Sequence, residues 1–318
     1  MSAPRLASPA AASIVVAALL IACTGTRAPA AEPVRSSTHV GTSHAQAVAQ
    51  AAVADSAVVF PTSVQQGAMV IGKVPAGSTV QHGGRRLRVT PYGSVVFGVA
   101  RDEAGPARLL VTLPGGREQP VSIEVVPRDW PAETIRGAPK QTVKPSPAVA
   151  ARIQREQALV SAARVRDDAR TGFAEHFQWP VRGRISGRFG SHRVYLLPDG
   201  SGSKGSSHSG MDIAAPTGTP VLAPAAGVVT FADPDLYLTG GTILLDHGHG
   251  ISSNFLHLSR LDVRVGDAVS QGEVIGAVGA TGRATGPHLH WGMNWFDVRI
   301  DPLLVLERGE QARPAGAP

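Results

Sequence analysis

Short runs of β-branched and other apolar residues, separated by turn residues, recur along the chain from residue 57 onward. Residues 109–113 and 121–126 are examples in the first half, and residues 241–246 and 288–293 are examples in the second. Turns rich in Gly and Pro separate the runs at spacings of roughly 8 to 15 residues. The pattern predicts a mainly β protein, with a small immunoglobulin-like β-sandwich over residues 57–130 and an all-β domain over residues 177–306.

One segment between these two β regions has a helical pattern instead. Ser146 and Pro147 form a good N-terminal cap, and the Gly-free segment that follows is rich in Ala, Arg and Gln. Residues 131–176 are therefore predicted to be a linker that contains a helix over residues 147–170. The favoured role is a strut between the domains, and the alternative is a partner-binding helix.

The N-terminus has the features of an export signal. Arg5 precedes an apolar stretch over residues 10–22, which is too short to cross a bilayer and typical of a signal-peptide core. The stretch runs into Cys23 in a sequence that resembles a lipobox, so we expect residues 1–22 to be removed and Cys23 to carry a lipid. The alternative is ordinary secretion, with cleavage after residues 28–30. Either route exports the protein to the cell envelope, as a membrane-anchored lipoprotein facing the periplasm or as a secreted or periplasmic protein.

Composition adds three expectations. Residues 23–56 are rich in Ala, Ser, Thr and Gly without an apolar period, which predicts a flexible tether, and residues 307–318 are expected to be a disordered tail. The formal net charge is +6, but Lys and Arg are scattered, which favours weak attraction to an anionic surface and argues against nucleic acid as a partner. Cys23 is the only cysteine, so no disulfide stabilises the exported chain.

Histidines are concentrated in the second β region, where seven of the eleven lie between His192 and His290. His288 and His290 alternate along a predicted strand, so both side chains should project from one face into a cleft. His208 and Asp212 are four residues apart, and Gly210 with Pro216 argues against a helix there. This pair should therefore lie where a loop enters a strand.

Two His and one carboxylate are a ligand set that zinc accepts readily, leaving a fourth position for water as in catalytic sites. A lone His257 lies between the two motifs in the sequence, and the order H-x-x-x-D, His, H-x-H within one β domain is more specific than any single motif. His247 and His249 form a second H-x-H in a Gly-flanked segment, and His247 is interpreted as a structural turn residue. Asn254, on the strand leading to His257, has no assigned role.

These residues resemble a known family, the lysostaphin-type (LytM-domain) zinc metallopeptidases, over residues 179–302. The matching segments are residues 179–180, 208–213, 215–221, 227–229, 246–248, 257–259, 281–282 and 285–290. The resemblance implies a LytM/lysostaphin-like fold of the duplicated hybrid motif type. It also implies one Zn²⁺ per chain held by His208, Asp212 and His290, with His257 and His288 as catalytic residues.

The function that this resemblance implies is a zinc metalloendopeptidase that hydrolyses peptide cross-links of peptidoglycan. The metal lowers the pKa of its bound water and polarises the scissile carbonyl. No H-E-x-x-H motif is present, so proton transfer would fall to His257 and His288, in an order that the sequence leaves open. A D-Ala-to-diamino-acid bond is the expected target, with a glycine bridge as the alternative.

Two other functions were weighed against the enzyme. A non-enzymatic LytM-domain regulator of other wall hydrolases would lack some ligands, and none is substituted here. A zinc carrier or sensor would not require His257 and His288. A protein regulator of the enzyme is a further expected partner, because the N-terminal β region and the helix could latch the cleft.

Overall fold

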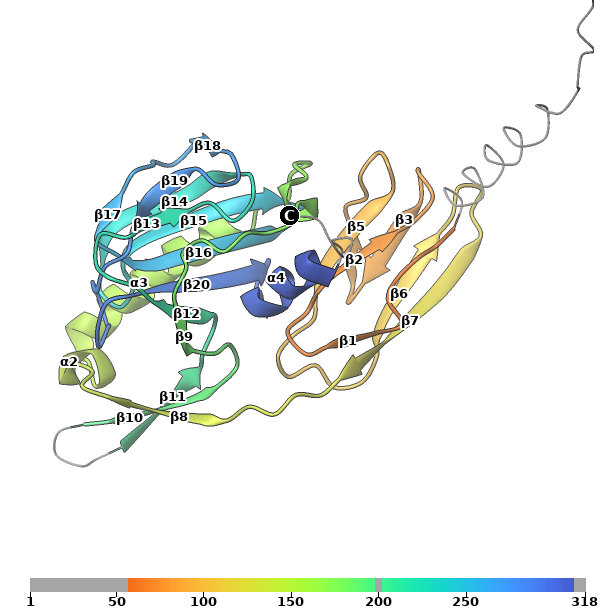
Figure 1. Ribbon diagram of the computed structural model, residues 1–318. Helices are drawn as coiled ribbons and strands as arrows, with labels where there is room; N and C mark the ends of the chain where they lie inside the picture. The colour runs from red at the N-terminus through yellow and green to blue at the C-terminus, as the bar shows by residue number, and fades with distance from the viewer. Residues whose placement is uncertain (1–56, 198–201, 312–318) are drawn as a thin grey trace, which may run out of the picture. The chain divides into compact units, whose positions relative to one another are not determined.

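The computed structural model describes residues 57–197 and 202–311, all within one compact unit that spans Val48–Pro318 (Figure 1). The predicted signal peptide, Cys23, the tether up to residue 56 and residues 312–318 lie outside the described residues. The fold is mainly β, as the spacing of the apolar runs predicted. Among the residues that the structure describes, no helix is long and apolar enough to cross a membrane.

The N-terminal β region consists of a five-stranded sheet in the order β1-β7-β6-β3-β4 and a two-stranded sheet of β2 and β5. Along β6 and β7, Leu109, Val111 and Ile123 point inward and alternate with exposed or partly exposed residues. The region is β as predicted, and its immunoglobulin-like character stays a prediction. Its strands are β1 Ser63–Gln65, β2 Met69–Lys73, β3 Thr79–His82, β4 Arg85–Leu87, β5 Ser94–Gly98, β6 Ala107–Thr112 and β7 Glu118–Val126.

The segment predicted as a linker contributes a strand as well as helices. Strand β8 (Ala132–Arg136) pairs in parallel with β10 (His192–Leu196), which also pairs with β11 (Gly202–Ser207). A short α2 (Lys140–Val143) follows, and the 3₁₀ helix η1 (Gly172–Ala174) leads into the C-terminal region. The linker is thus partly built into a sheet of the C-terminal region.

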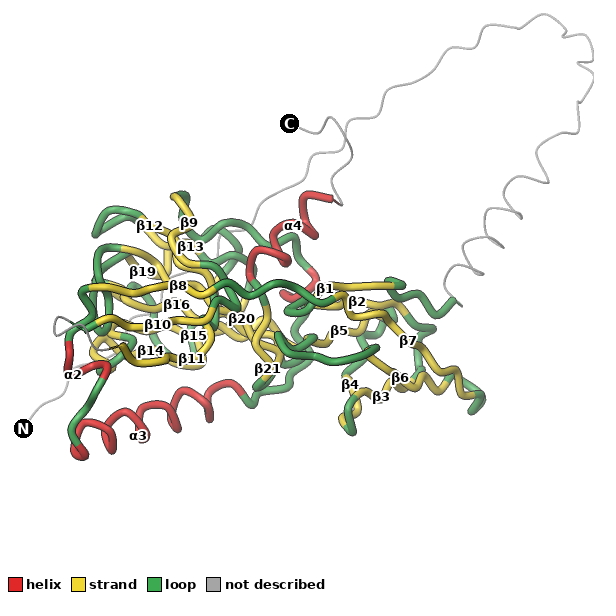
Figure 2. Tube along the Cα trace, turned by 90° about the horizontal axis from the view of Figure 1, so that it is seen from below, coloured by secondary structure: helices red, strands yellow, loops and turns green. Residues whose placement is uncertain are grey.

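The long helix α3 spans Pro147–Arg164, six residues short of the predicted end at 170. The Ser146 hydroxyl accepts a hydrogen bond from the Val149 amide at 3.4 Å, as expected of an N-cap. Two carbonyls beyond Arg164 are used in tertiary contacts, because Asp167 O accepts from Arg88 and Asp168 O accepts from the His249 amide. The segment beyond Arg164 is thus held by tertiary contacts in a non-helical conformation. Helix α3 runs along β14 and β15 (Figure 2).

The C-terminal region is built on an eight-stranded sheet, whose main path is β18-β14-β15-β16-β20-β12-β9 with β21 paired to β20. A three-stranded sheet in the order β13-β19-β17 accompanies it. The core contains Met211, Ile213, Phe255, Leu289 and Trp291, each at most 1% exposed. The strands are β9 Arg184–Gly187, β12 Met211–Ala214, β13 Pro220–Leu222, β14 Gly227–Leu236, β15 Gly240–Gly248, β16 Ile251–Leu258, β17 Arg260–Leu261, β18 Ala268–Val269, β19 Val274–Ala277, β20 His288–Trp295 and β21 Val298–Ile300.

The expectation of a disordered tail from residue 307 is wrong for its first residues, because α4 spans Pro302–Gln311. The Asp301 carboxylate accepts a hydrogen bond from the Leu303 amide at 2.9 Å and an ion pair from Arg128 at 2.8 Å. Val305 packs into the core. An N-terminal cap and an apolar face stabilise α4, which therefore extends beyond residue 306, the predicted end of the domain.

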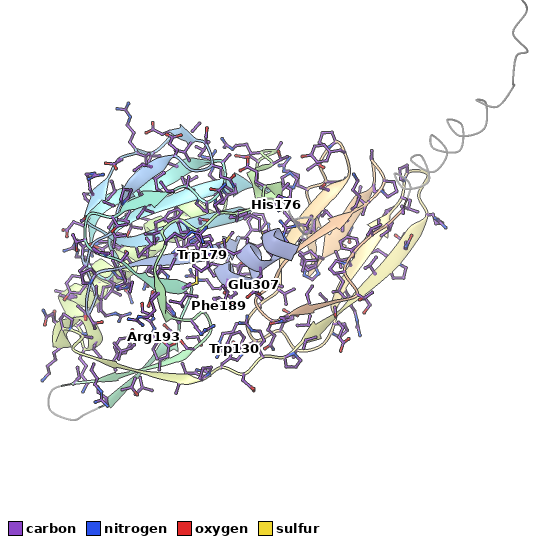
Figure 3. All side chains as sticks on the ribbon, in the orientation of Figure 1. Trp130, His176, Trp179, Phe189, Arg193 and Glu307 are labelled. Carbon is purple, nitrogen blue, oxygen red and sulfur yellow. The ribbon has the colours of Figure 1, made fainter. Side chains whose placement is uncertain are left out.

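The N-terminal β region and the C-terminal sheet share one hydrophobic core. Phe97 of β5 meets Trp295 of β20 edge to face, with ring centroids 6.3 Å apart. Gly98 beside it allows this approach, since a Cβ there would lie 2.8 Å from the Trp295 Cβ. Trp130 and Phe189 make a second edge-to-face contact at 5.8 Å (Figure 3). The N-terminal β region is therefore packed against the rest of the described chain.

His247 is a structural residue, as predicted, but it lies at the end of β15 rather than in a turn, and it is fully buried. Its Nδ1–H donates to the Ala226 carbonyl at 2.8 Å, and its Nε2 meets the Ser253 hydroxyl at 2.9 Å. Burial lowers the pKa of His247 from 6.5 to about 4, and the hydrogen bond to Ala226 opposes the shift only partly. The imidazole is therefore neutral in the folded protein at neutral pH.

Because the unfolded chain binds a proton at His247 near pH 6.5 and the folded chain does so only near pH 4, stability should fall as pH drops through this window. As the pH falls, the free energy of unfolding should decrease less in His247→Gln than in the wild type, by up to about 3 kcal/mol. The measurement is urea unfolding at a series of pH values in the presence of chelator. The exposed His176→Gln is the control and should keep the wild-type slope, and an unchanged slope in His247→Gln would contradict the assignment.

Candidate functional site

The candidate site is set by the antiparallel pairing of β12 with β20, which places Asp212 directly opposite His290. His208 approaches from the loop between β11 and β12, as predicted for a loop that enters a strand. Gly210 makes this approach possible, because a Cβ there would lie 2.4 Å from the Trp291 carbonyl oxygen. Three side chains that are distant in sequence therefore converge at one place.

The three converging side chains offer one compact set of donor atoms. His208 Nε2 lies 3.1 Å from Asp212 Oδ1 and 3.0 Å from His290 Nδ1, and the latter two atoms are 2.8 Å apart. All three residues are buried. A tetrahedral ion with metal–ligand distances of about 2.0–2.1 Å needs donor atoms roughly 3.3 Å apart, close to this spacing. The residues present therefore fit a metal ion with two imidazole ligands and one carboxylate ligand.

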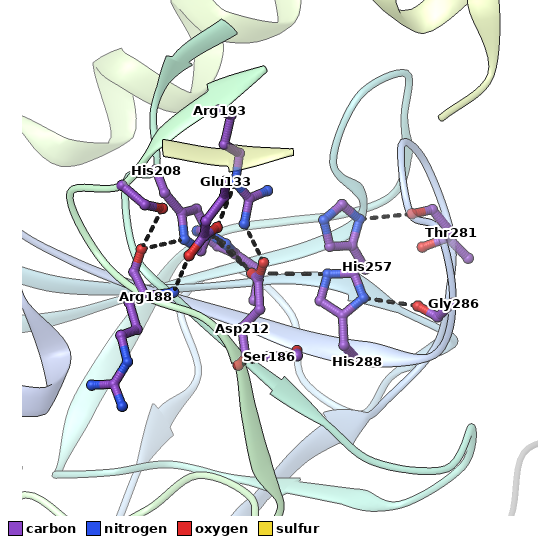
Figure 4. Close-up of polar contacts among 12 residues, drawn as sticks. Glu133, Ser186, Arg188, Arg193, His208, Asp212, His257, Thr281, Gly286 and His288 are labelled. Carbon is purple, nitrogen blue, oxygen red and sulfur yellow. Dashed lines mark hydrogen bonds and ion pairs between the residues drawn. The ribbon is translucent and has the colours of Figure 1, made fainter. Parts of the chain in front are cut away.

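The orientation of the His208 ring is fixed by a hydrogen bond from its other ring nitrogen. Its Nδ1–H donates to the Arg188 carbonyl at 2.9 Å, which leaves the Nε2 lone pair directed at Asp212 and His290 (Figure 4). A hydrogen bond from the far ring nitrogen to a carbonyl is the usual support of a metal-binding histidine. This contact favours the tautomer that a metal ligand needs.

Asp212 is held by two charged residues, Arg193 and Glu133, that the sequence did not predict. Its Oδ2 accepts a hydrogen bond from Arg193 Nη2, and Glu133 Oε2 lies 3.9 Å from Arg193 Nε (Figure 4). Burial raises the pKa of Asp212, but the contacts with the imidazoles of His208 and His290 outweigh it and hold this pKa well below its usual range. The carboxylate is therefore ionised and oriented.

His257 and His288 lie beside this cluster, and their ring centroids are 4.8 Å apart. Each Nδ1–H donates to a backbone carbonyl at 2.8 Å, of Thr281 for His257 and of Gly286 for His288. Their Nε2 atoms make no hydrogen bond to the described residues, and His288 Nε2 lies 3.9 Å from Asp212 Oδ1. The two imidazoles are thus oriented with a free nitrogen each.

The backbone at His257 has a left-handed φ of 65°, which non-glycine residues adopt rarely. Burial, followed by the charges of His288 and His290, lowers the pKa of His257 to about 3. Strained backbone at a buried polar residue is characteristic of functional sites. The site opens into a cavity of about 980 Å³ whose wall includes His208, His257 and His290.

All five residues singled out from the sequence are brought together here, and their roles stay predictions. His247 and His249 lie outside the cluster. Sequence reasoning missed Arg193 and Glu133, which come from β10 and β8. No motif marks either residue, because their proximity to Asp212 depends on the pairing of these two strands.

Comparisons with known proteins agree on the C-terminal region. The model of Peptidase family M23 matches residues 206–302. A solved structure from Pseudomonas aeruginosa assigned to peptidase M23 is 32% identical, with a TM-score of 0.58, and the match covers 76% of this chain and 94% of that one.

Two curated relatives are similar to about a third of the chain. The Peptidoglycan DD-endopeptidase ShyA of Vibrio cholerae is 38% identical over 116 residues, covering 36% of this chain and 26% of the relative. The DD-carboxypeptidase/endopeptidase Mpg of Neisseria meningitidis is 48% identical over 98 residues, covering 31% of this chain and 22% of the relative. The chain thus spans about a quarter of the length of these relatives.

The contact between Arg193 and Asp212 should strengthen metal binding. We expect Arg193→Gln to lower the affinity for a divalent transition-metal ion about tenfold or more, because Asp212 Oδ2 is left buried and unpaired. Arg193→Lys should be intermediate, since it keeps the charge but loses the planar fork. Competition with a chromophoric chelator measures the affinity.

Arg184→Gln is the matched control for this prediction. Arg184 is exposed on β9, the strand next to β12, and makes no ion pair with the residues that the structure describes. The metal affinity of the Arg184→Gln variant should equal that of the wild type. Wild-type affinity in Arg193→Gln would show that the guanidinium does not support the ligand.

Proposed function

The chain belongs to peptidase family M23, and from that premise we propose that it is a zinc metalloendopeptidase that hydrolyses peptide cross-links of peptidoglycan. The observation that carries the proposal is the completeness of the site. Three donor atoms lie within 4.8 Å of one another, and two further imidazoles beside them each keep a free nitrogen. A binding module or a metal carrier would not need the second pair.

Zinc is the metal that we propose for His208, Asp212 and His290. Two imidazoles and one carboxylate in a buried cluster are a donor set typical of catalytic zinc. When bound, zinc supplies Lewis-acid chemistry, polarising a carbonyl and making water more acidic. Asp212 supplies a single negative charge, so the site stays electrophilic.

His257 and His288 divide the proton transfer and the stabilisation of the developing oxyanion between them. The carbonyls of Thr281 and Gly286 hold the two Nδ1–H groups, so that both Nε2 atoms are available to water and substrate. Because each ring is fixed by a backbone contact, little reorganisation is needed when the substrate binds.

The substrate class rests on the relatives. ShyA is described as a peptidoglycan DD-endopeptidase and Mpg as a DD-carboxypeptidase/endopeptidase, and they are 38% and 48% identical to this chain over the matched residues. We therefore propose peptidoglycan peptides as the substrate, with the D-Ala-to-diamino-acid bond as the bond cleaved.

Purified protein should release soluble muropeptides from isolated peptidoglycan, and a chelator should abolish the release until zinc is restored. His290→Ala should lose the metal, because one of three ligands is removed. His288→Ala should keep the metal and lose about 100-fold or more in turnover, because it removes a proton-transfer group. Zinc content and muropeptide chromatography measure the two effects.

His176→Ala, at an exposed histidine away from the cluster, is the control and should change neither quantity. Zinc-loaded wild-type protein that releases no muropeptide would favour the non-enzymatic regulator. Wild-type turnover in His288→Ala would refute the role proposed for that residue.

We also propose that the protein acts outside the cytoplasm, anchored to the membrane through a lipid on Cys23. The support is the apolar segment that precedes Cys23 and the site of a wall-degrading enzyme in the same chain. Cells that express the protein should incorporate labelled palmitate into it, and Cys23→Ala should abolish the label. Equal labelling of both proteins would refute the anchor.

A further inference from the structure

Two arginines in the cavity wall have no carboxylate partner. Arg164 lies at the end of α3 and Arg299 on β21, and both line the cavity that contains His257 and His290. Among the described residues, no carboxylate oxygen lies within 4.0 Å of either guanidinium. Arg299 Nη1 donates only to Asn294 Oδ1, at 3.4 Å, and Arg164 Nε is buried without a partner.

This arrangement costs stability in the unliganded protein. Burial and then the charge of Arg299 lower the pKa of Arg164 to about 9, and burial lowers the pKa of Arg299. Two other partly buried arginines are compensated, since Arg128 pairs with Asp301 and Arg193 pairs with Asp212. Burial also lowers the pKa of Arg308, which does not line the cavity. Two desolvated like charges that face a cavity are stabilised when an anion enters it.

Arg299 pairs with Asn294 near the far end of β20, the strand that also carries His290. Asn294 and His290 are four residues apart on one face of β20, a distance of roughly 13 Å. Arg299 contacts Asn294, so its guanidinium lies at the far end of this stretch. An extended peptide of about four residues spans the same length.

The face of β20 between His290 and Asn294 is covered by a polar side chain. Asn254 of β16 pairs with Gly292 and covers it, because a Cβ at Gly292 would lie 2.7 Å from Asn254 Oδ1. Asn254 Oδ1 and Asn294 Nδ2 are buried and have no partner among the described residues. Asn254 also lines the cavity, so its free acceptor is available to a peptide N–H.

We infer that Arg164 and Arg299 form an anion subsite that binds a free carboxylate of the substrate peptide, roughly 13 Å from the metal ligands. This inference rests on the proposed function and adds the feature by which the site selects its peptide. The planar guanidinium forks match a carboxylate in bidentate geometry, and Asn254 hydrogen-bonds the peptide backbone between the two ends. Asp297, which also lines the cavity, is exposed and makes no ion pair with either arginine within the described chain.

Cross-linked muropeptides with free carboxylates, and the same muropeptides with these groups converted to carboxamides, test the subsite. The wild type should have a kcat/KM at least about tenfold higher for the free acids, because a charge-assisted hydrogen bond is lost with the amides. Arg299→Gln and Arg164→Gln should each remove most of this preference, mainly through KM. Both variants should lower kcat/KM for the carboxamides much less than for the free acids.

Arg155→Gln is the matched control, because Arg155 is exposed on the same helix and does not line the cavity. It should retain the wild-type preference. Thermal unfolding separates a ligand-binding role from a structural one. Removal of a desolvated charge without a partner should leave Tm unchanged or raise it, whereas a marked decrease in Tm for both variants would overturn the inference.

Equilibrium binding of the same two muropeptides to metal-free protein keeps this test independent of catalysis. Tighter binding of the free acid that both Arg→Gln substitutions abolish would support the subsite, even in a protein that cleaves nothing. Equal binding of acid and amide by the wild type would refute the subsite, even in a protein that cleaves both. Lack of any cleavage by the zinc-loaded protein bears only on the proposed function.

Discussion

The pairing of β12 with β20 is the constraint on which the site depends. It places Asp212 opposite His290, and the alternation along β20 sends His288 and His290 to one face and Leu289 and Trp291 to the other. A shift of one residue would bury the imidazoles and expose the core side chains, at a large cost in free energy. The packing of Leu289 and Trp291 therefore fixes the positions of His290 and Asp212, two of the three proposed metal ligands.

The arginines around the cavity occur in two electrostatic environments. Arg193 lies between the carboxylates of Asp212 and Glu133, so that opposite charges alternate from the ligand outward. Arg164 and Arg299 have no such partners and destabilise each other. Arg193 binds a carboxylate of the protein itself, Asp212, whereas Arg164 and Arg299 are placed to bind an anion of the substrate.

Much of the site could be predicted from the sequence because its elements are local. Alternation along a strand predicts the shared face of His288 and His290, and Gly210 with Pro216 predicts the loop at His208. The supporting residues depend on strand pairings between distant segments, as Glu133 does, and no local pattern marks them. The end of α3 was predicted six residues too late and α4 was not predicted at all, because tertiary contacts of Asp167 and a cap from Asp301 are not visible in a local pattern.

The parallel pairing of β8 with β10 determines which part of this chain forms a self-contained unit. The family match begins at residue 206, yet Glu133, Arg164 and Arg193 all precede it. Recombination that transferred only residues 206–302 to another protein would carry His208, Asp212 and His290 and leave behind the side chains that orient Asp212. The heritable unit that contains the complete site therefore begins no later than β8, well upstream of the segment that the family model matches.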